Sequence, residues 1–397
     1  MKTREVFDNI HWIGVNDRET VAFEGLWNIE KEGVAYNAYI INDDKVAVID
    51  TVKAFKANEF LDNIKEVIGD KQVDYLIVNH VEPDHSSGIL ALRDVYPDMA
   101  IYASKKGVDM IGNFFNVCDN VHELAEGETL PLGEHTLQFF MTPMVHWPES
   151  MVTYETKTKT LFSMDIFGSF GTVNGGIFDD ENDYESYEDS INRYYACIVG
   201  KVTGQAERAL NKLASIEIKT ICPAHGLVWR SHPEYILNKY TSLAKCEKQE
   251  GVVIVYGTMY GNTRDAVEIL ANELKAQGVR NIKMYDLSRV DISYAIADIW
   301  VTKGVVLAAP SYYSKIFPKM AYMLYKLSEV KVKNNKLGFV CNYSWSCGAD
   351  REFERFIEET KADVASPMVL IKSGVQPEDQ EKLAVLAKDM AQAMQEA

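Results

Sequence analysis

The run Tyr75-Leu76-Ile77-Val78-Asn79-His80-Val81-Glu82-Pro83-Asp84-His85 places imidazole and carboxylate side chains directly after an apolar, strand-like segment. Residues that follow a buried strand lie on a loop at the strand's carboxyl end, which is where α/β folds keep their functional sites. Imidazole suits zinc, copper and iron alike, whereas carboxylate oxygen favours harder ions. The run therefore predicts a metal-binding loop, and its Glu82 argues against zinc.

Three more imidazole or carboxylate residues, His146, Asp165 and His225, each follow a strand-like apolar stretch within a few residues. Histidines combined with three carboxylates are closer to non-haem iron coordination than to a structural zinc site, which usually has four Cys or His ligands. The sequence therefore predicts a site for two iron ions, built from His80, Glu82, Asp84, His146, Asp165 and His225.

The pattern His-x-Glu-x-Asp-His, followed by a distant His, Asp and His, resembles the metallo-β-lactamase fold in its flavodiiron version, in which Glu replaces a His of the zinc hydrolases. Carried over residue by residue, the resemblance gives one iron His80, Glu82 and His146, gives the other Asp84 and His225, and makes Asp165 the bridge. It leaves His85 open, because this position is a ligand in some members and is swung away in others. Residues 46–51 resemble the fold's early strand, which ends in a structural aspartate, here Asp50.

Two aromatic positions are candidates for walls or proton donors of the metal pocket. Trp147 directly follows His146, and Tyr194 and Tyr195 lie in the next helical segment, where we single out Tyr195. The alternative is that these side chains are ordinary core aromatics.

The second half of the chain contains a candidate phosphate loop. The apolar run 252–256 predicts a buried parallel strand, and it leads through Gly257-Thr258-Met259-Tyr260-Gly261-Asn262-Thr263 into a helical segment, residues 264–276. Hydroxyl, amide and backbone N–H groups at a helix start can bind one phosphate without a lysine. The loop is neither a Walker loop nor a Gly-x-Gly-x-x-Gly loop. Taken alone, it could be simply a capped turn.

Two further strand ends carry aromatic loops, Pro310-Ser311-Tyr312-Tyr313 and the stretch 341–348. An isoalloxazine ring needs aromatic faces and backbone donors, and a single phosphate selects FMN over FAD. This half resembles flavodoxin along its whole length, although Tyr312 and Trp345 could be packing aromatics. The resemblance implies an FMN site formed by Thr258, Met259, Tyr260, Gly261, Asn262, Thr263, Pro310, Ser311, Tyr312, Asn342, Tyr343, Ser344, Trp345 and Ser346.

Length and charge both favour two domains. The chain has 397 residues with 47% hydrophobic content, more than one core usually holds. Residues 1–250 carry 23 basic and 40 acidic side chains, whereas residues 251–397 carry 18 of each. We expect an α+β metallo-β-lactamase-like αββα sandwich over residues 1–249, followed by an α/β flavodoxin-like doubly wound parallel sheet over residues 250–397. The acidic first half argues against nucleic acid as a partner.

Membrane and targeting signals are not evident. No stretch approaches the ~20 apolar residues of a membrane span, and residues 1–10 have no apolar signal core, so we expect a cytoplasmic protein. The six cysteines include no Cys-x-x-Cys pair, which argues against a disulfide framework and against a built-in rubredoxin-type iron site. Electrons are therefore expected from another molecule.

The resemblance implies an enzyme in which FMN passes electrons to two irons that reduce O2 to water, NO to N2O, or both. It allows rubredoxin, a deazaflavin or a flavin reductase as the electron donor. Two other classes stay open. One is a zinc-type metallo-hydrolase with an appended flavodoxin module, against which Glu82 counts; the other is an electron carrier whose metal domain is only structural.

Domain size and family resemblance both point to an oligomer. Domains of these lengths have radii of gyration of roughly 15 and 18 Å, so their centres lie about 30 Å apart or more. Cofactors held at loop edges of the two domains could then be too distant for fast electron transfer within one chain. The resemblance implies a head-to-tail homodimer, or a dimer of dimers, in which the FMN of one chain lies against the irons of the other.

A local excess of lysine follows the second flavin loop. The excess consists of Lys315, Lys319, Lys326, Lys331, Lys333 and Lys336. It forms either a solvated surface or a basic patch near the flavin that attracts a small acidic redox protein.

Overall fold

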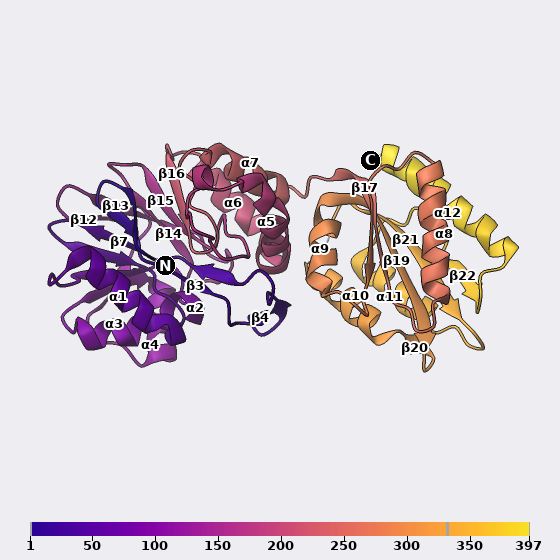
Figure 1. Ribbon diagram of the computed structural model, residues 1–397, viewed down its shortest axis with the longest axis horizontal. Coiled ribbons are helices and arrows are strands. Elements are labelled where there is room, and N and C mark those ends of the chain that lie inside the picture. Colours follow the sequence, from indigo (N-terminus) through magenta and orange to yellow (C-terminus); the bar gives the residue numbers. More distant parts are fainter. Residues whose placement is uncertain (1, 331–332, 397) are drawn as a thin grey trace. The chain divides into compact units, whose positions relative to one another are not determined.

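The computed structural model describes residues 2–330 and 333–396. The chain divides into two compact units, Met1–Ala244 and Lys245–Ala397 (Figure 1). Each unit has its own sheets and its own covering helices.

The first unit is built on two packed sheets. The first sheet has the order β1 (Arg4–Phe7), β2 (Ile10–Trp12), β7 (Tyr39–Asn42), β8 (Val46–Ile49), β9 (Tyr75–Val78), β10 (Ala100–Ser104) and β11 (Val121–Leu124). The second has the order β12 (Thr129–Pro131), β13 (Thr136–Met141), β14 (Met151–Glu155), β15 (Thr160–Met164) and β16 (Thr220–Pro223). Strands β8, β14, β15 and β16 are buried along their whole length, as expected for strands covered on both faces.

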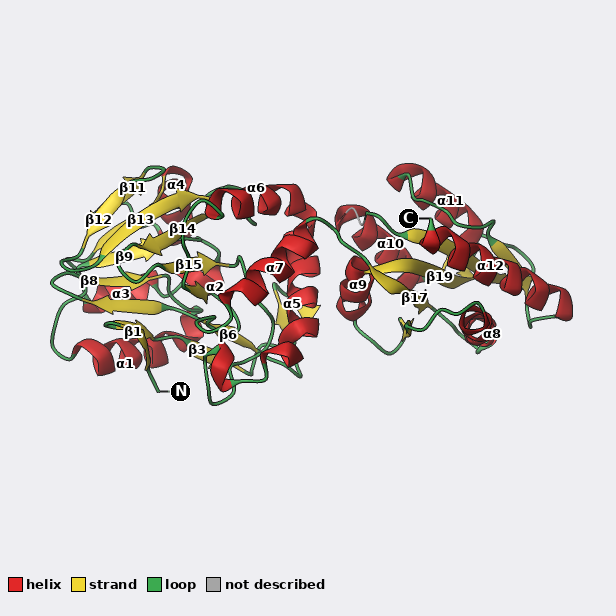
Figure 2. Cartoon of the chain, turned by 90° about the horizontal axis from the view of Figure 1, so that it is seen from above, coloured by secondary structure: helices red, strands yellow, loops and turns green. Residues whose placement is uncertain are grey.

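Helices cover the outer faces of both sheets (Figures 1 and 2). They are α1 (Ala57–Ile68), α3 (Ile89–Val95) and α4 (Lys105–Phe115) on one side, and α6 (Thr203–Leu213) and α7 (Pro233–Ala244) on the other. Helix α1 is amphipathic, because Phe60, Ile64 and Ile68 recur at four-residue spacing on its buried face. The result is the αββα sandwich that the sequence predicted.

Shorter elements surround the ends of the strands. Two small two-stranded sheets pair β3 (Val15–Asp17) with β6 (Val34–Tyr36), and β4 (Ala22–Phe23) with β5 (Trp27–Asn28). The short helical segments are α2 (Pro83–Ser86), α5 (Glu188–Tyr194), the 3-10 turns η1 (Ala54–Lys56), η2 (Asp179–Glu181), η3 (Tyr184–Tyr187) and η5 (Gly200–Val202), and the π-helical η4 (Tyr195–Val199).

The second unit is a doubly wound parallel sheet of order β18 (Ile282–Asp286), β17 (Gln249–Tyr256), β19 (Thr302–Tyr312), β21 (Lys336–Tyr343) and β22 (Val369–Lys372), with β20 (Lys315–Ile316) paired to β19. Its helices are α8 (Asn262–Ala276), α9 (Ile292–Val301), α10 (Pro318–Val330), α11 (Ala349–Thr360) and α12 (Pro377–Gln395). Helices α8 and α12 share one core with the sheet. The strand order reverses between β17 and β19, and ligands of such folds bind at this switch point. The predicted flavodoxin-like fold is confirmed.

Within the described residues, none of the helices combines the length and the apolar composition needed to cross a membrane.

Candidate metal centre and flavin site

The metal ligands predicted from the sequence lie on loops from both sheets of the first unit. Residues 80–85 follow β9 of the first sheet, and His146, Asp165 and His225 follow β13, β15 and β16 of the second. Strands β13, β15 and β16 run in one direction, because β13 and β15 are both antiparallel to β14 and β16 is parallel to β15. Their carboxyl ends therefore meet at one edge, where the predicted residues come together.

Local sequence fixes the first of these loops. The carboxylate of Asp50 accepts hydrogen bonds from the backbone N–H and the side-chain amide of Asn79, at 2.7 and 2.9 Å. Pro83 occupies the first turn of α2, where its missing N–H costs no hydrogen bond. Asp50 therefore has the structural role that the sequence suggested, and it holds the residue that precedes His80.

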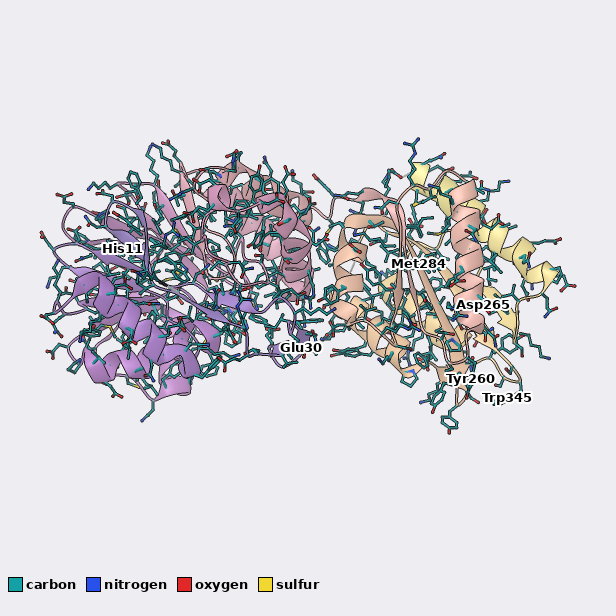
Figure 3. All side chains as sticks on the ribbon, in the orientation of Figure 1. His11, Glu30, Tyr260, Asp265, Met284 and Trp345 are labelled. Atoms are coloured by element: carbon teal, nitrogen blue, oxygen red, sulfur yellow. The ribbon has the colours of Figure 1, made fainter. Side chains whose placement is uncertain are left out.

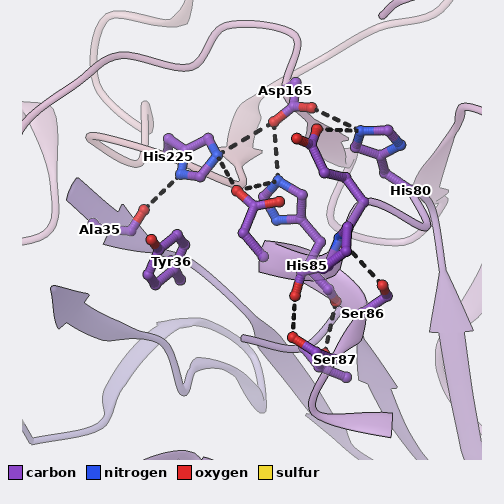
Figure 4. Close-up of polar contacts among 12 residues, drawn as sticks. Ala35, Tyr36, His80, His85, Ser86, Ser87, Asp165 and His225 are labelled. Carbon is purple, nitrogen blue, oxygen red and sulfur yellow. Dashed lines mark hydrogen bonds and ion pairs between the residues drawn. The ribbon is translucent and has the colours of Figure 1, made fainter. Parts of the chain in front are cut away.

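Asp165 lies between two groups of possible ligands, and its two oxygens face different groups (Figure 4). Its Oδ2 is 3.3 Å from His80 Nε2 and 3.2 Å from His146 Nε2, and Glu82 Oε2 completes this group at 3.1 and 3.0 Å from the same two nitrogens. Its Oδ1 is 3.1 Å from His85 Nε2 and 3.4 Å from His225 Nε2. This is the arrangement expected of a carboxylate that bridges two metal ions.

The second group consists of Asp84, His85 and His225. Asp84 Oδ2 lies 3.4 Å from both His85 Nε2 and His225 Nε2. The sequence left His85 open. In the structure its ring nitrogen faces the other donors, so His85 is positioned to be a ligand.

The electrostatics of the cluster favour a bound cation. Burial is the largest influence on His80 and disfavours its charge, yet hydrogen bonds to Glu149 and Glu82 and the charge of Asp165 raise its pKa to about 10. The pKa of His146 is likewise raised to about 10, where burial is outweighed by hydrogen bonds to Asp165 and Glu82. The carboxylates around these two imidazoles therefore stabilise positive charge at the cluster. Metal ions supply that charge in place of protons.

Several buried polar atoms of the cluster also have no hydrogen-bond partner among the described residues. These atoms are Asp84 Oδ1 and Oδ2, His85 Nδ1 and Nε2, and His225 Nε2. Unsatisfied buried polar groups are costly, and a group of them around one space is explained by an ion.

The loop from β17 to α8 is folded for a phosphate. Gly261 has a φ of +99°, which side chains of L residues rarely adopt, and its N–H donates to Thr258 Oγ1 at 3.1 Å. Helix α8 begins at the next residue, Asn262. The free N–H groups and the positive dipole end of α8 therefore face this loop.

A pocket at the carboxyl ends of β17, β19 and β21 is lined by Thr258, Met259, Tyr260, Asn262, Thr263, Pro310, Ser311, Tyr313, Ser314, Asn342, Tyr343, Ser344, Trp345 and Ser346. Tyr260 and Trp345 stand at its rim, each 92% exposed (Figure 3). A phosphate loop on one side and aromatic side chains on the other match the shape and chemistry of FMN.

Two of the residues assigned to the flavin from the sequence have a different position. Gly261 shapes the phosphate loop but does not line the pocket, and Tyr312 is replaced there by Tyr313 and Ser314. Tyr312, the last residue of β19, packs its ring edge-on against that of Tyr313, with centroids 4.5 Å apart, and so lies behind the pocket wall. Tyr313 and Ser314, which were not assigned to the flavin site from the sequence, have φ values of +46° and +58° and form the tight turn into β20. The sequence did not reveal this turn because the turn contains no glycine.

Comparison with known proteins covers both units. A model described as ODP family beta lactamase matches residues 34–226, and the flavodoxin model matches residues 254–385. The solved rubredoxin oxygen:oxidoreductase from the anaerobe Desulfovibrio gigas is 28% identical, with a TM-score of 0.95, and the match covers 100% of this chain and 99% of that one. The flavodiiron protein from Giardia intestinalis is 25% identical, with a TM-score of 0.94 and coverage of 99% and 96%.

Curated relatives match over most of the chain as well. The anaerobic nitric oxide reductase flavorubredoxin of Pectobacterium atrosepticum is 30% identical over 367 residues, which is 90% of this chain and 71% of the relative. The chain belongs to the flavodiiron protein family. The flavorubredoxin of Escherichia coli O1:K1 is also 30% identical, over 87% of this chain and 73% of the relative.

Membership of the flavodiiron family confirms the predicted cofactors, FMN and a pair of non-haem irons. The donor set described above fits the irons, and the pocket of the second unit fits FMN. The predicted enzyme class, a flavodiiron oxidoreductase, is confirmed as well, and the metallo-hydrolase alternative is set aside.

One residue of this flavodiiron centre was not found from the sequence. Glu149 Oε1 lies 2.7 Å from His80 Nδ1 and accepts the backbone N–H of Val81 at 3.0 Å. It therefore orients the imidazole so that Nε2 faces the metal space, as the outer carboxylate does in many metal sites. Its only sequence signal is its place three residues after His146.

The choice of Tyr195 as the catalytic tyrosine is corrected by the structure. The Tyr194 hydroxyl donates to Asp165 Oδ1 at 2.8 Å, whereas the Tyr195 hydroxyl contacts Thr203 Oγ1 at 2.7 Å and its ring packs on Tyr240. Neighbouring residues of a helix point about 100° apart, so only one of the pair can reach the metal centre. Burial raises the pKa of Tyr194 well above its usual value, which keeps the hydroxyl protonated.

Trp147 lies where the sequence suggested, against the ligands of the first group. Its ring meets those of His80 and His146 edge-on, with centroids 5.2 and 6.1 Å away. Phe114 stacks on its other side at 6.2 Å. Trp147 is therefore a wall of the site.

Proposed function

We propose that this flavodiiron protein reduces nitric oxide to nitrous oxide, oxygen to water, or both. The curated relatives are named nitric oxide reductases, and the Desulfovibrio gigas relative is named an oxygen oxidoreductase. The observation that carries the proposal is the division of Asp165 between two donor groups, because paired metals about 3.5–4 Å apart act as a clamp on two oxygen-bearing groups. Reduced FMN and a diferrous pair hold two electrons each, which suffices for the four electrons of O2 reduction and exceeds the two needed for a pair of NO molecules.

The ligand assignment is part of this proposal. One iron would be held by His80, Glu82 and His146, and the other by Asp84, His85 and His225, with Asp165 shared between the two groups. The two donor groups and the inward-facing nitrogen of His85 support it.

Two aromatic residues, Tyr194 and Trp147, would support the metal site without binding a metal ion. Tyr194 fixes the bridging carboxylate through its hydrogen bond to Asp165 and offers a hydroxyl proton beside the second group. Trp147 closes the side of His80 and His146 with an apolar ring and restricts water there. The chain's own residues would thus hold the substrate site in place and limit its access to small gas molecules.

We further propose a head-to-tail homodimer, alone or as a dimer of dimers. Tyr260, Tyr313 and Trp345 are each at least 87% exposed around the flavin pocket, and large exposed aromatics mark interaction surfaces. On the metal unit, Phe114 is 49% exposed where it stacks on Trp147. An apolar rim around each cofactor site suits contact between the flavin unit of one chain and the metal unit of its partner.

The docking face for an acidic electron donor such as rubredoxin is smaller than the lysine content suggested. Strand β21 has eight residues, so Lys336 at its start lies roughly 23 Å from the flavin end. Lys326 and Lys336 are also paired, with Glu329 and Asp363. Lys331 lies outside the described residues. Lys315 and Lys319 are exposed beside the pocket residue Ser314 and form no ion pair within the described part of the chain, so we assign the face to them.

We propose a cytoplasmic location, because none of the six cysteines forms a disulfide within the described residues, as expected in a reducing compartment.

Two experiments test the proposal. In the first, the purified protein is reduced anaerobically and supplied with NO or with O2 in separate runs, while N2O formation and O2 consumption are followed. Turnover of at least one gas is expected, and turnover of neither would refute the proposed function.

In the second experiment, a chain with Thr258 and Asn262 replaced by Ala is co-expressed with a His146→Ala chain. Confirmed heterodimers should regain activity, and inert heterodimers would exclude the cross-chain route.

A further inference from the structure

Two cysteines bracket the loop that forms one wall of the flavin pocket. Cys341 lies near the end of β21, in register with Ala309 of β19 and Leu370 of β22, and Cys347 lies two residues before α11. All five residues between them, 342–346, line the pocket. The chain thus leaves β21 just beyond one thiol, passes along the flavin site, and enters α11 just beyond the other.

The loop places the two thiols on one side of the sheet. Cys341 pairs with Ala309, which shares a face of β19 with Ser311, and Ser311 Oγ lies 3.9 Å from Cys347 Sγ. A hydrogen bond between the two thiols is also the largest influence on the pKa of both groups. Cys341 is fully buried and its Sγ touches Met368 Sδ at 3.3 Å, whereas Cys347 is partly exposed. Of the two thiols, a reagent from solution can therefore reach only Cys347, because Cys341 is buried.

The surroundings of Cys347 favour its thiolate form. The Ser311 hydroxyl oxygen accepts the backbone N–H groups of Gly348 and Ala349 at 2.9 and 3.2 Å, which leaves its own O–H to donate to Cys347 Sγ at 3.9 Å. The sulfur also lies at the start of α11, where the helix dipole favours negative charge. Donation from the Cys341 thiol is the largest of these influences, and together they lower the pKa of Cys347 to about 7.

We propose that Cys341 and Cys347 form a redox-active thiol pair that a hydroperoxide converts reversibly into a disulfide. The Cys347 thiolate attacks the peroxide oxygen, which gives a sulfenic acid and releases hydroxide. The Cys341 thiol then attacks the sulfenic sulfur, the S–S bond forms, and one water leaves, so two thiols and one hydrogen peroxide give one disulfide and two waters. Neither FMN nor the iron centre takes part in this step.

The disulfide would tie both ends of the flavin loop together. Because residues 342–346 lie between the two sulfurs, the oxidised pair holds this wall of the pocket closed and slows the release of FMN. The thiol pair therefore links the oxidative state of the surroundings to flavin retention, beyond the gas reduction proposed above.

Peptide mapping of the FMN-loaded protein tests the pair directly. After treatment with stoichiometric hydrogen peroxide, the protein is denatured, alkylated and digested with trypsin. Both cysteines fall in the single peptide 337–351, between Lys336 and Arg351. We expect this peptide to be two hydrogen atoms lighter and unalkylated, and to regain two alkyl groups after dithiothreitol. Alkylation of both cysteines after peroxide treatment, or sulfinic acid on Cys347 beside an alkylated Cys341, would overturn the proposal.

Variants and a control site separate this chemistry from general oxidation. Cys118 is an exposed thiol of the first unit, so in the reduced wild-type protein it should alkylate at neutral pH several-fold more slowly than Cys347 does. In Cys347→Ser the light peptide should be absent, whereas Cys118→Ser should still form it. Release of FMN, followed by flavin fluorescence on dilution, should slow a few-fold on oxidation of the wild type and of Cys118→Ser, and not of Cys347→Ser. An equal response in all three proteins would refute the link to the flavin.

Discussion

The carboxylate of Glu149 lies 2.7 Å from Nδ1 of His80, on the side of the imidazole that faces away from the metal centre. Both side chains are buried, and within the described residues the Glu149 carboxylate binds His80 and accepts the Val81 N–H. The position of one predicted iron ligand thus depends on a residue that does not itself reach the metal space.

We expect Glu149→Gln to lower iron affinity at the first group by about tenfold or more, because outer carboxylates hold and polarise metal-bound histidines. Iron content after dialysis against a graded chelator measures the effect. Glu155→Gln is the control, since Glu155 is equally buried but accepts the backbone N–H groups of Lys157 and Thr158. Equal iron loss in both variants would mean that Glu149 has only a general structural role.

Tyr194→Phe should reduce kcat for gas reduction about tenfold or more, since a hydrogen bond to a charged carboxylate is worth roughly 1.5–3 kcal/mol. Tyr195→Phe, which loses only its contact with Thr203, should keep its turnover. Steady-state kinetics of the two variants, with iron content checked in each, make the comparison. If Tyr195→Phe were the slower enzyme, the assignment to Tyr194 would be wrong.

Glu82→His should shift metal occupancy from iron toward zinc and abolish gas reduction. The exchange replaces a carboxylate 3.0 Å from His146 Nε2 with a third imidazole, which suits zinc as well as iron. Elemental analysis of protein grown in iron-replete medium tests the shift. Active wild-type protein that contained two zincs and no iron would refute the di-iron assignment.

Gly261→Ala should weaken FMN binding about tenfold, because a side chain at φ +99° strains the phosphate loop by roughly 1–3 kcal/mol. Gly278→Ala is the control. Gly278 has a similar φ of +90°, so alanine is strained there too, but the residue lies on the surface beyond α8. It should lower stability without changing the FMN dissociation constant. Flavin fluorescence titration of the two apoproteins distinguishes these outcomes.

Replacing Lys315 and Lys319 with Glu should slow FMN reduction by rubredoxin, and the wild-type rate should fall as salt rises, since the Debye length shrinks from about 30 Å at 0.01 M to about 10 Å at 0.1 M. Lys336→Glu, at the far end of β21, should have little effect. Stopped-flow reduction by rubredoxin, with dithionite as the donor control, provides the measurement. A rate indifferent to salt and to both lysines would exclude this docking face.

The sequence by itself determined the two folds and nearly all of the residues that gather at the two sites. Each predicted metal ligand follows a largely apolar strand, and the flavin loops follow three parallel strands, so local patterns were enough to place them at strand ends. Because the carboxyl ends of parallel strands share one edge of a sheet, the fold class then implied that these residues would meet.

The tertiary structure alone decided which neighbours of these residues reach the sites. Glu149 and His80 are 69 positions apart and meet only because loops of two different sheets pack together. Tyr194 and Tyr195 are both fully buried, so neither hydrophobicity nor spacing separates them, and only the rotation of the helix directs one to Asp165 and the other to Thr203. Likewise, the contact between Cys341 and Cys347 depends on the path of the loop between them, which the order of residues does not specify.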